Sequence, residues 1–300
     1  MTTATAERPG SVHAPMDIRK KRHVSNASVA RYIFLILVTL LALFPIVYVI
    51  SASLKTNKEL MLGGVNIFTA NPTLDNFKQA WGLAHFGRYT LNSIYVCAIA
   101  VTGVVITSSM SAYVFSRGKF PGKKIIYTMF LATMFVSAGS VTIFPISQLA
   151  AKLHLNNLTG LGVIQMFTIS AVNLFLTMGY MKTISTEIDE AAEIDGCSFF
   201  RTYWNIIMPL SKPILATVAL TTFQSVWNEY LLSRVMTIHD SMTYTLVVGV
   251  TQLKSMGGEG AAQWNLMMAG TLFAIVPIIV VYLSLNQYFI AGLTAGSVKG

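Results

Sequence analysis

The chain has 300 residues, of which 54% are hydrophobic and only 11% charged, and its formal net charge is +9 at pH 7. Soluble domains carry about 25% charged residues, so this composition indicates a protein whose main solvent is lipid. The two cysteines, Cys97 and Cys197, provide no disulfide framework, and the five histidines are too scattered to form a metal-binding pair. We therefore expect no metal-dependent chemistry. The polar, basic stretch before residue 24 lacks the features of a cleaved signal peptide.

Six apolar segments are long enough to cross a bilayer as helices, which takes about 20 residues. Three of them contain a proline, which neighbouring helices can accommodate inside a membrane. The sequence therefore predicts an all-α integral membrane protein. We expect a basic segment over 1–29, one six-span transmembrane domain over 30–290 and a tail over 291–300. The expected spans are 30–54, 89–116, 124–150, 160–182, 211–234 and 266–290.

Basic residues indicate the orientation, because cytoplasmic loops carry an excess of lysine and arginine. One side of the expected topology has fourteen of them: Arg8, Arg19, Lys20, Lys21, Arg22, Arg31, Arg117, Lys119, Lys123, Lys124, Lys182, Arg201, Lys212 and Lys299. The other side has seven: Lys55, Lys58, Lys78, Arg88, Lys152, Arg234 and Lys254. We therefore expect both termini to lie in the cytoplasm.

The longest polar stretch between two apolar segments, 186–213, contains five of the twelve acidic residues. Its pattern predicts two short helices that meet at Gly196, a residue suited to the left-handed conformation that ends a helix. We expect the Thr186 hydroxyl to cap the first helix, with Asp189 completing a near-capping box. The second helix is expected to begin at Ser198 and to end at two prolines. This segment, which we call the elbow, has the shape of a surface that another protein binds.

The elbow also carries a motif. Glu190-Ala191-Ala192 is followed after three residues by Gly196 and after nine more by Ile206-Ile207-Met208-Pro209. This spacing closely resembles the EAA-x3-G-x9-I-x-L-P loop of the membrane subunits of binding-protein-dependent ABC importers, with Met208 in place of the usual leucine. Trp227-Asn228-Glu229-Tyr230 and the terminal run 286–300 further resemble the MalG-like permeases of carbohydrate-uptake systems. The similarity covers nearly all of the chain after residue 28.

The resemblance implies the transmembrane domain of a type I ABC importer, in the cytoplasmic membrane of a bacterium or archaeon, with the elbow as its cytoplasmic helical coupling loop. It implies as partners a second, MalF-like permease, two ABC ATPase subunits that bind ATP and Mg, and an extracytoplasmic sugar-binding protein. The chain itself has no GxxxxGK[ST] loop and no nucleophile–base spacing. We therefore expect no bound cofactor, no nucleic-acid partner and no catalysis, but a half-pathway for a sugar or oligosaccharide, coupled to ATP hydrolysis in the partners.

Glu190 is the main expected contact with an ATPase subunit, because an acid beside two methyl-sized residues can approach a donor closely. A charge-assisted hydrogen bond of this kind contributes roughly 1.5–3 kcal/mol. A solvated acidic face is the alternative, and it is what we expect for Glu187, Asp189 and Glu193. The resemblance assigns ATPase coupling to Glu190, Ala191, Ala192, Asp195, Gly196, Ile206 and Pro209, although Asp195 and Gly196 are favoured as architecture. It assigns a tail contact to Gly296, Ser297, Val298, Lys299 and Gly300.

The substrate pathway has six candidate residues: Gln148, Gln165, Asn173, Trp227, Asn228 and Glu229. Amides and aromatic faces suit sugar hydroxyls, but polar bonding between helices accounts for the amides equally well. An acid inside a span is costly and by default suggests a function. Glu229, however, is expected near the outer end of its span, where a structural hydrogen bond with the following loop is favoured over a sugar contact.

Other interpretations stay open at this point. The elbow motif is common to importers, so the solute could belong to another class. A stand-alone secondary transporter would be expected to have internal inverted repeats and ionisable groups buried in the membrane. A membrane-embedded enzyme or scaffold is opposed by the lack of a catalytic constellation.

Overall fold

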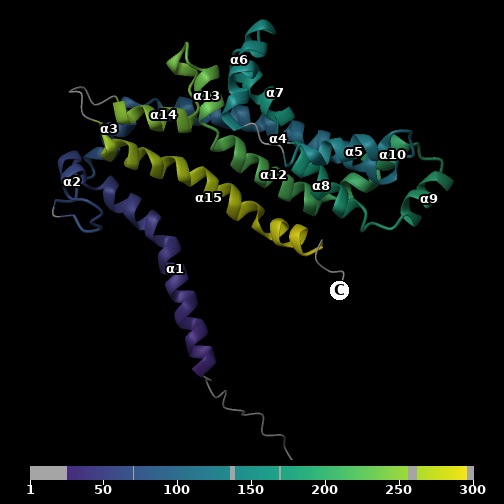
Figure 1. Ribbon diagram of the computed structural model, residues 1–300, viewed down its shortest axis with the longest axis horizontal. Coiled ribbons are helices and arrows are strands. Elements are labelled where there is room, and N and C mark those ends of the chain that lie inside the picture. The colour runs from purple at the N-terminus through teal and green to yellow at the C-terminus, as the bar shows by residue number, and fades with distance from the viewer. Residues whose placement is uncertain (1–25, 70, 136–138, 169, 256–261, 296–300) are drawn as a thin grey trace, which may run out of the picture. The chain divides into compact units, whose positions relative to one another are not determined.

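The computed structural model describes residues 26–69, 71–135, 139–168, 170–255 and 262–295 (Figure 1). Every regular element within these ranges is a helix, in agreement with the predicted all-α class. The described residues fall into two units that divide between Ile46 and Val47. Helix α1 (Asn26–Ser53) begins in the first unit and ends in the second, and its part over Val29–Ser53 has a mean hydropathy of 3.0. This helix matches the first expected span.

Two further helices are long and apolar enough to cross a membrane. They are α4 (Phe86–Arg117) and α15 (Trp264–Ala295), which match the second and sixth expected spans. Each has 32 residues, which corresponds to about 48 Å at the helical rise of 1.5 Å per residue. Both are therefore longer than the hydrocarbon thickness of about 30 Å.

One expected span is bent, and another is shorter than expected. The segment expected over 160–182 consists of α7 (Leu158–Thr168) and α8 (Ser170–Met181), which meet at 53°. The helix expected over 211–234 is α12 (Lys212–Trp227), which begins near the expected residue but ends seven residues early. It meets the preceding elbow helices at 77°. It ends at Trp227 because the polar residues that follow bond locally, since Asn228 donates its amide to the Gln224 carbonyl at 2.9 Å.

The third expected span, 124–150, is not one helix, so this expectation is wrong. It contains α5 (Lys123–Ala132), the 3₁₀ turn η1 (Gly139–Thr142) and α6 (Ile143–Lys152). Gly139 has a positive φ of 55°, which interrupts a right-handed helix. Pro145 lacks an amide hydrogen and would clash with the carbonyl four residues earlier in a continuous helix, whereas the first turn of α6 tolerates it.

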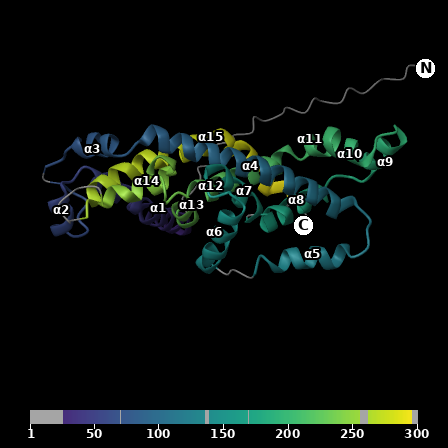
Figure 2. The same cartoon turned by 90° about the horizontal axis from the view of Figure 1, so that it is seen from above.

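Helix α4 is the central element of the second unit and packs against α7, α8, α12 and α14. Helix α15 packs along α12 and against the short helix α3 (Asp75–Leu83). Helix α15 also contacts α2 (Asn57–Leu62), α14 (Leu246–Gln252) and η4 (Leu253–Ser255), while α13 (Leu231–Met236) packs on α6 and η3 (Ser241–Thr243) on α4. The elbow lies at the opposite end of this unit, as Figures 1 and 2 show.

Close helix packing in this unit depends on glycines that leave room for a neighbour, as in many membrane helix bundles. A Cβ atom on Gly249 of α14 would lie 2.2 Å from Cδ2 of Tyr89, a buried residue of α4. The aromatic ring therefore occupies the space that any other residue would need. Gly179 of α8, in contrast, has no heavy atom within 4 Å of an added Cβ.

We predict that Gly249→Ala destabilises the protein by about 1–3 kcal/mol, because overpacking forces Tyr89 and its helix to move. Thermal unfolding of the purified protein in detergent measures this change. Gly179→Ala is the matched control, and it should leave stability unchanged or raise it by up to about 1 kcal/mol through helix propensity. Equal midpoints for the two variants would contradict the packing argument.

Candidate functional site

The first helix of the elbow, α9 (Glu187–Ile194), begins differently from the prediction. Thr186 already has helical backbone angles (φ −69°, ψ −21°), and its side chain makes no capping bond. A capping residue needs an extended backbone to aim its oxygen at the helix start, so the role passes back to Ser185, whose hydroxyl accepts the Glu187 amide at 3.3 Å. Gly196 ends the helix with φ +76°, as predicted.

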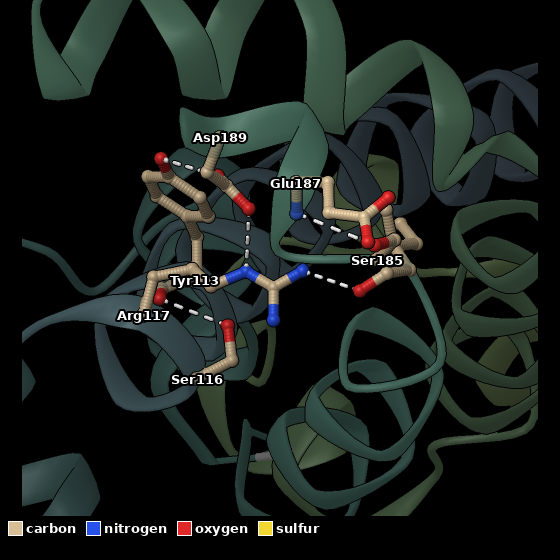
Figure 3. A network of polar contacts seen from close by, with 7 residues as sticks. Tyr113, Ser116, Arg117, Ser185, Glu187 and Asp189 are labelled. Atoms are coloured by element: carbon tan, nitrogen blue, oxygen red, sulfur yellow. Dashed lines mark hydrogen bonds and ion pairs between the residues drawn. The ribbon is translucent and has the colours of Figure 1, made fainter. Parts of the chain in front are cut away.

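Asp189 holds α9 against the end of α4, so the expectation that it is a solvated acid or part of a capping box is wrong (Figure 3). Its Oδ2 lies 2.8 Å from Nε of Arg117 in an ion pair, and the two side chains are only 19% and 11% exposed. Its Oδ1 accepts the Tyr113 hydroxyl at 3.2 Å. Arg117 also donates from Nη2 to the Ile184 carbonyl at 2.6 Å. The carboxylate lies in the first turn of one helix and the guanidinium in the last turn of another, where both helix dipoles favour them.

The second limb of the elbow consists of α10 (Phe199–Thr202), the π-helical segment η2 (Tyr203–Ile207) and α11 (Met208–Leu210). Ser198 has an extended backbone and its hydroxyl accepts the Arg201 amide at 3.3 Å, which confirms the predicted start. The buried Tyr203 hydroxyl lies 2.8 Å from that of Ser109 on α4. Burial raises the pKa of this phenol, and the hydrogen bond with Ser109 opposes part of the shift.

Both limbs are thus attached to one face of α4. Ser109, Tyr113 and Arg117 follow one another at intervals of four residues, which places them on the same side of a helix. The Tyr113 ring lies 5.5 Å from that of Tyr203 and 4.4 Å from that of Phe199, and so packs on the second limb while its hydroxyl bonds the first. Tyr203 therefore packs on α4, a helix of this chain.

The residues of the EAA motif differ in their exposure to solvent. Glu190 and Ala191 are exposed, whereas Ala192 is only 3% exposed and packs within the chain. Ala192 therefore does not offer the close approach to a partner that we expected of it. Asp195, Gly196 and Pro209 are exposed and Ile206 is half-buried.

Large apolar side chains on the outside of the elbow were not predicted as site residues. Ile194 is 87% exposed, Phe200 60% and Trp204 47%. The rings of Phe200 and Trp204 stack at 6.3 Å with an interplanar angle of 18°. The rings of Phe200 and Trp204 also lie 6.1 and 6.0 Å from that of Tyr203. Their spacing of four residues was the available signal. Together with Glu190, these residues give the elbow an outer face that is both acidic and apolar.

The candidate pathway residues make contacts within the protein. Asn173 of α8 donates to the Thr222 hydroxyl of α12 at 3.2 Å, and the Trp227 indole of α12 donates to the Ala274 carbonyl of α15 at 3.2 Å. Glu229 accepts the Leu232 amide at 3.0 Å and so caps α13, which agrees with its favoured structural role. Gln165 is buried in α7, while Asn228 and Gln148 are exposed. A sugar contact by any of the six stays a prediction.

The remaining expected site residues, Gly296, Ser297, Val298, Lys299 and Gly300, lie outside the described residues. Over the part of the chain that is described, no three His, Cys, Asp or Glu side chains are placed to hold a metal ion.

We predict that Asp189→Asn loosens the elbow, because it leaves the Arg117 guanidinium without its charged partner. A charge-assisted contact of this kind is worth roughly 1.5–3 kcal/mol. Hydrogen exchange of the α9 amides should therefore accelerate by about 10- to 100-fold, while exchange in α15 stays unchanged. Glu187→Gln, a change at an exposed acid in the same turn, is the control, and equal exchange in both variants would show that the ion pair does not hold α9.

Comparisons with known proteins agree with the elbow motif. A family model described as "Binding-protein-dependent transport system inner membrane component" matches residues 103–294. Over 264 residues the chain is 34% identical to the probable starch degradation products transport system permease protein AmyC of Thermoanaerobacterium thermosulfurigenes, covering 88% of this chain and 94% of AmyC. It is 31% identical over 270 residues to the sn-glycerol-3-phosphate transport system permease protein UgpE of Pectobacterium atrosepticum, covering 87% and 94%.

A solved structure shows the same fold. One chain of a bacterial ABC transporter involved in the import of the acidic polysaccharide alginate superimposes with a TM-score of 0.73 at 24% sequence identity, over 89% of this chain and 98% of that chain. The family expected from the elbow is therefore confirmed. The chain belongs to the binding-protein-dependent inner membrane components, and it is a non-catalytic, multi-pass permease subunit of an ABC importer.

Proposed function

We propose that this chain forms half of the translocation pathway of a sugar or oligosaccharide importer, and that its elbow docks on an ATPase subunit and transmits the movement of that subunit to α4. The observation that carries the proposal is the double attachment of the elbow. Both limbs are bound to α4 through Ser109, Tyr113 and Arg117, while the outer face around Glu190 stays exposed.

The outer face of the elbow suits a protein partner. Interfaces are enriched in aromatic residues, and exposed apolar side chains grouped in one place commonly mark such a surface. Ile194, Phe200 and Trp204 supply this apolar area, and Glu190 supplies a carboxylate for a basic or backbone donor. The polar contact fixes the orientation of the partner, while burial of the aromatic pair supplies much of the binding energy.

The inner face of the elbow suits transmission of force. An ion pair and a hydrogen bond tie α9 and η2 to the last turns of α4, and α4 packs against α7, α8 and α12. Alternating access needs two packings of the spans that the partners stabilise differently. A displacement of the elbow by closing ATPase subunits would act on α4 and, through it, on α7, α8 and α12.

The partners follow from the family. A MalF-like second permease would complete the pathway, two ATPase subunits would bind ATP and Mg, and an extracytoplasmic binding protein would deliver the solute. The tail residues Gly296–Gly300 are proposed as a second contact with an ATPase subunit, on the resemblance alone.

The proposed orientation places the elbow and both termini in the cytoplasm. It is supported by the excess of basic residues on that side, four of which, Arg117, Lys119, Lys123 and Lys124, lie where α4 ends and α5 begins. The seven basic residues expected outside include exposed lysines beside α2 and α3, at the far end of the second unit.

We predict that a membrane-impermeant maleimide labels Cys197 in inside-out vesicles and not in right-side-out vesicles. Cys197 is partly exposed in the elbow, whereas Cys97 is buried in α4 and should stay unlabelled in both. Cys197→Ser is the control that identifies the labelled thiol. Labelling of Cys197 from the outside would refute the orientation and with it the coupling role of the elbow.

A carbohydrate is the favoured solute. The names of AmyC and of the structurally similar transporter refer to starch degradation products and to alginate, both built from sugars. A phosphorylated polyol is the second candidate, because the name of UgpE refers to sn-glycerol-3-phosphate. In the family that this chain resembles, selectivity is largely delegated to the binding protein, so transport by the assembled complex decides between them.

We predict ATP-dependent uptake of an oligosaccharide, such as a maltooligosaccharide mixture, by proteoliposomes that contain this chain, its partner permease, the ATPase subunits and the binding protein. Glycerol phosphate should not be taken up. If only glycerol phosphate is taken up, the solute is a phosphorylated polyol instead of a sugar. Uptake in the absence of the ATPase subunits would overturn the proposed role in ATP-driven import.

In the same proteoliposomes, we predict that Glu190→Ala lowers uptake and the stimulated ATPase activity by roughly 10- to 100-fold, which corresponds to the loss of one charge-assisted contact. Membrane insertion should be unaffected because Glu190 is exposed. Glu193→Ala, at the first variable position after Glu190-Ala191-Ala192 and also exposed, is the matched control and should retain activity. Equal losses in both variants would indicate a general effect of negative charge instead of a specific contact.

A further inference from the structure

A pocket of about 610 Å³ lies at the start of α5, beside the ends of α4 and α8. Three of the residues that line it are lysines, Lys123, Lys124 and Lys182, and none is acidic. The coupling role of the elbow does not involve this pocket. Its composition, a strongly basic lining without acids, points to an anionic ligand.

The positive charge of the pocket is not neutralised within the described part of the chain. None of its three lysines forms an ion pair there, and Asp189 of the elbow is paired with Arg117. Lys123 donates to the Gly118 carbonyl at 2.8 Å, which fixes its ammonium group beside the pocket, whereas Lys124 and Lys182 are exposed.

The start of α5 adds to this positive potential. Its capping position is Gly122, in the left-handed conformation (φ +77°), which provides no side chain to accept the first amides. No acid lies in the first turn either. The amides at the start of a helix have no partner within the helix and attract anions, so backbone donors and lysines converge on the same space.

The walls of the pocket are apolar. Phe115, Phe120, Tyr127 and Met178 line it, and the rings of Phe115 and Tyr127 lie 5.6 Å apart. The apolar surface continues along α5, where Ile125 is 68% and Met129 66% exposed. Figure 2 shows α5 beside α8, with its other side open. A ligand that suits both surfaces has an anionic end and a long apolar part.

We propose that this pocket binds the phosphate headgroup of an anionic phospholipid, with its acyl chains along the exposed face of α5. Basic pockets between transmembrane helices on the cytoplasmic side are known to suit such headgroups. An acidic protein segment would use the lysines but not the adjoining aliphatic stripe, so the lipid is favoured. The site goes beyond the proposed function, which uses the elbow alone.

The experiment uses the purified, delipidated transporter complex in detergent, with phosphatidylglycerol, phosphatidylcholine or inorganic phosphate added back and bound lipid counted by native mass spectrometry. We expect phosphatidylglycerol to bind at least tenfold more tightly than phosphatidylcholine, and inorganic phosphate to compete only weakly. Lys124→Gln and Lys182→Gln should each weaken phosphatidylglycerol binding by roughly fivefold, and the triple variant with Lys123→Gln by on the order of a hundredfold.

The matched control replaces three exposed lysines outside the pocket, Lys58, Lys78 and Lys152, by glutamine, and it should bind phosphatidylglycerol as the unmodified chain does. If the triple pocket variant does not fold, the single variants decide, because Lys124 and Lys182 are exposed. Undiminished binding in the pocket variants, or equal binding of the two lipids, overturns the proposal. So does competition by inorganic phosphate at equal affinity, which would indicate a free-anion site. If the pocket variants lose a partner subunit from the complex but bind phosphatidylglycerol as before, the proposal is overturned, and the pocket is part of a protein interface instead.

Discussion

The ion pair between Arg117 and Asp189 is the contact on which the arrangement of the elbow depends. It joins the carboxyl end of α4 to the amino end of α9, so each charge is favoured by its own helix dipole as well as by its partner. The side chains are largely buried, and a partner lost here would leave a charge that water cannot fully solvate. Arg117 further holds the chain before α9 through the Ile184 carbonyl, so one guanidinium fixes both the helix and its approach.

The sequence predicted where the elbow helices end and begin around Gly196, but it did not predict which of their residues contact the rest of the chain. Gly196 and Ser198 were placed correctly, because a left-handed helix end and an extended cap depend on the residue itself and its nearest neighbours. The expected role of Asp189 was wrong, because its contacts are made with α4, which is distant in sequence. The burial of Ala192 was not foreseen either. The repeat of Ser109, Tyr113 and Arg117 along α4 was the available signal, but only the fold shows that it faces the elbow.

The spans show the same limit. Helices α1, α4 and α15 follow directly from long apolar runs. The segment 124–150 is also rich in apolar residues, but Gly139 and Pro145 divide it. A reading of hydrophobicity alone does not detect these two backbone constraints. The early end of α12 has a similar origin, since Asn228 and Glu229 bond the neighbouring backbone instead of continuing the helix. Helix breaks of this kind are tolerated at membrane depth where protein surrounds them.

The 77° bend between the second limb and α12 has a mechanical consequence. A displacement of the elbow would reach α4 through side-chain contacts near the end of that helix, and it would reach α12 through the continuous backbone after α11. The two helices would therefore receive the same displacement by different routes. Because α4 and α12 lie against each other, they would slide and tilt at their shared interface, the shear by which packed helices change arrangement without unfolding. A small displacement of the elbow would in this way produce relative motion along the whole interface between α4 and α12.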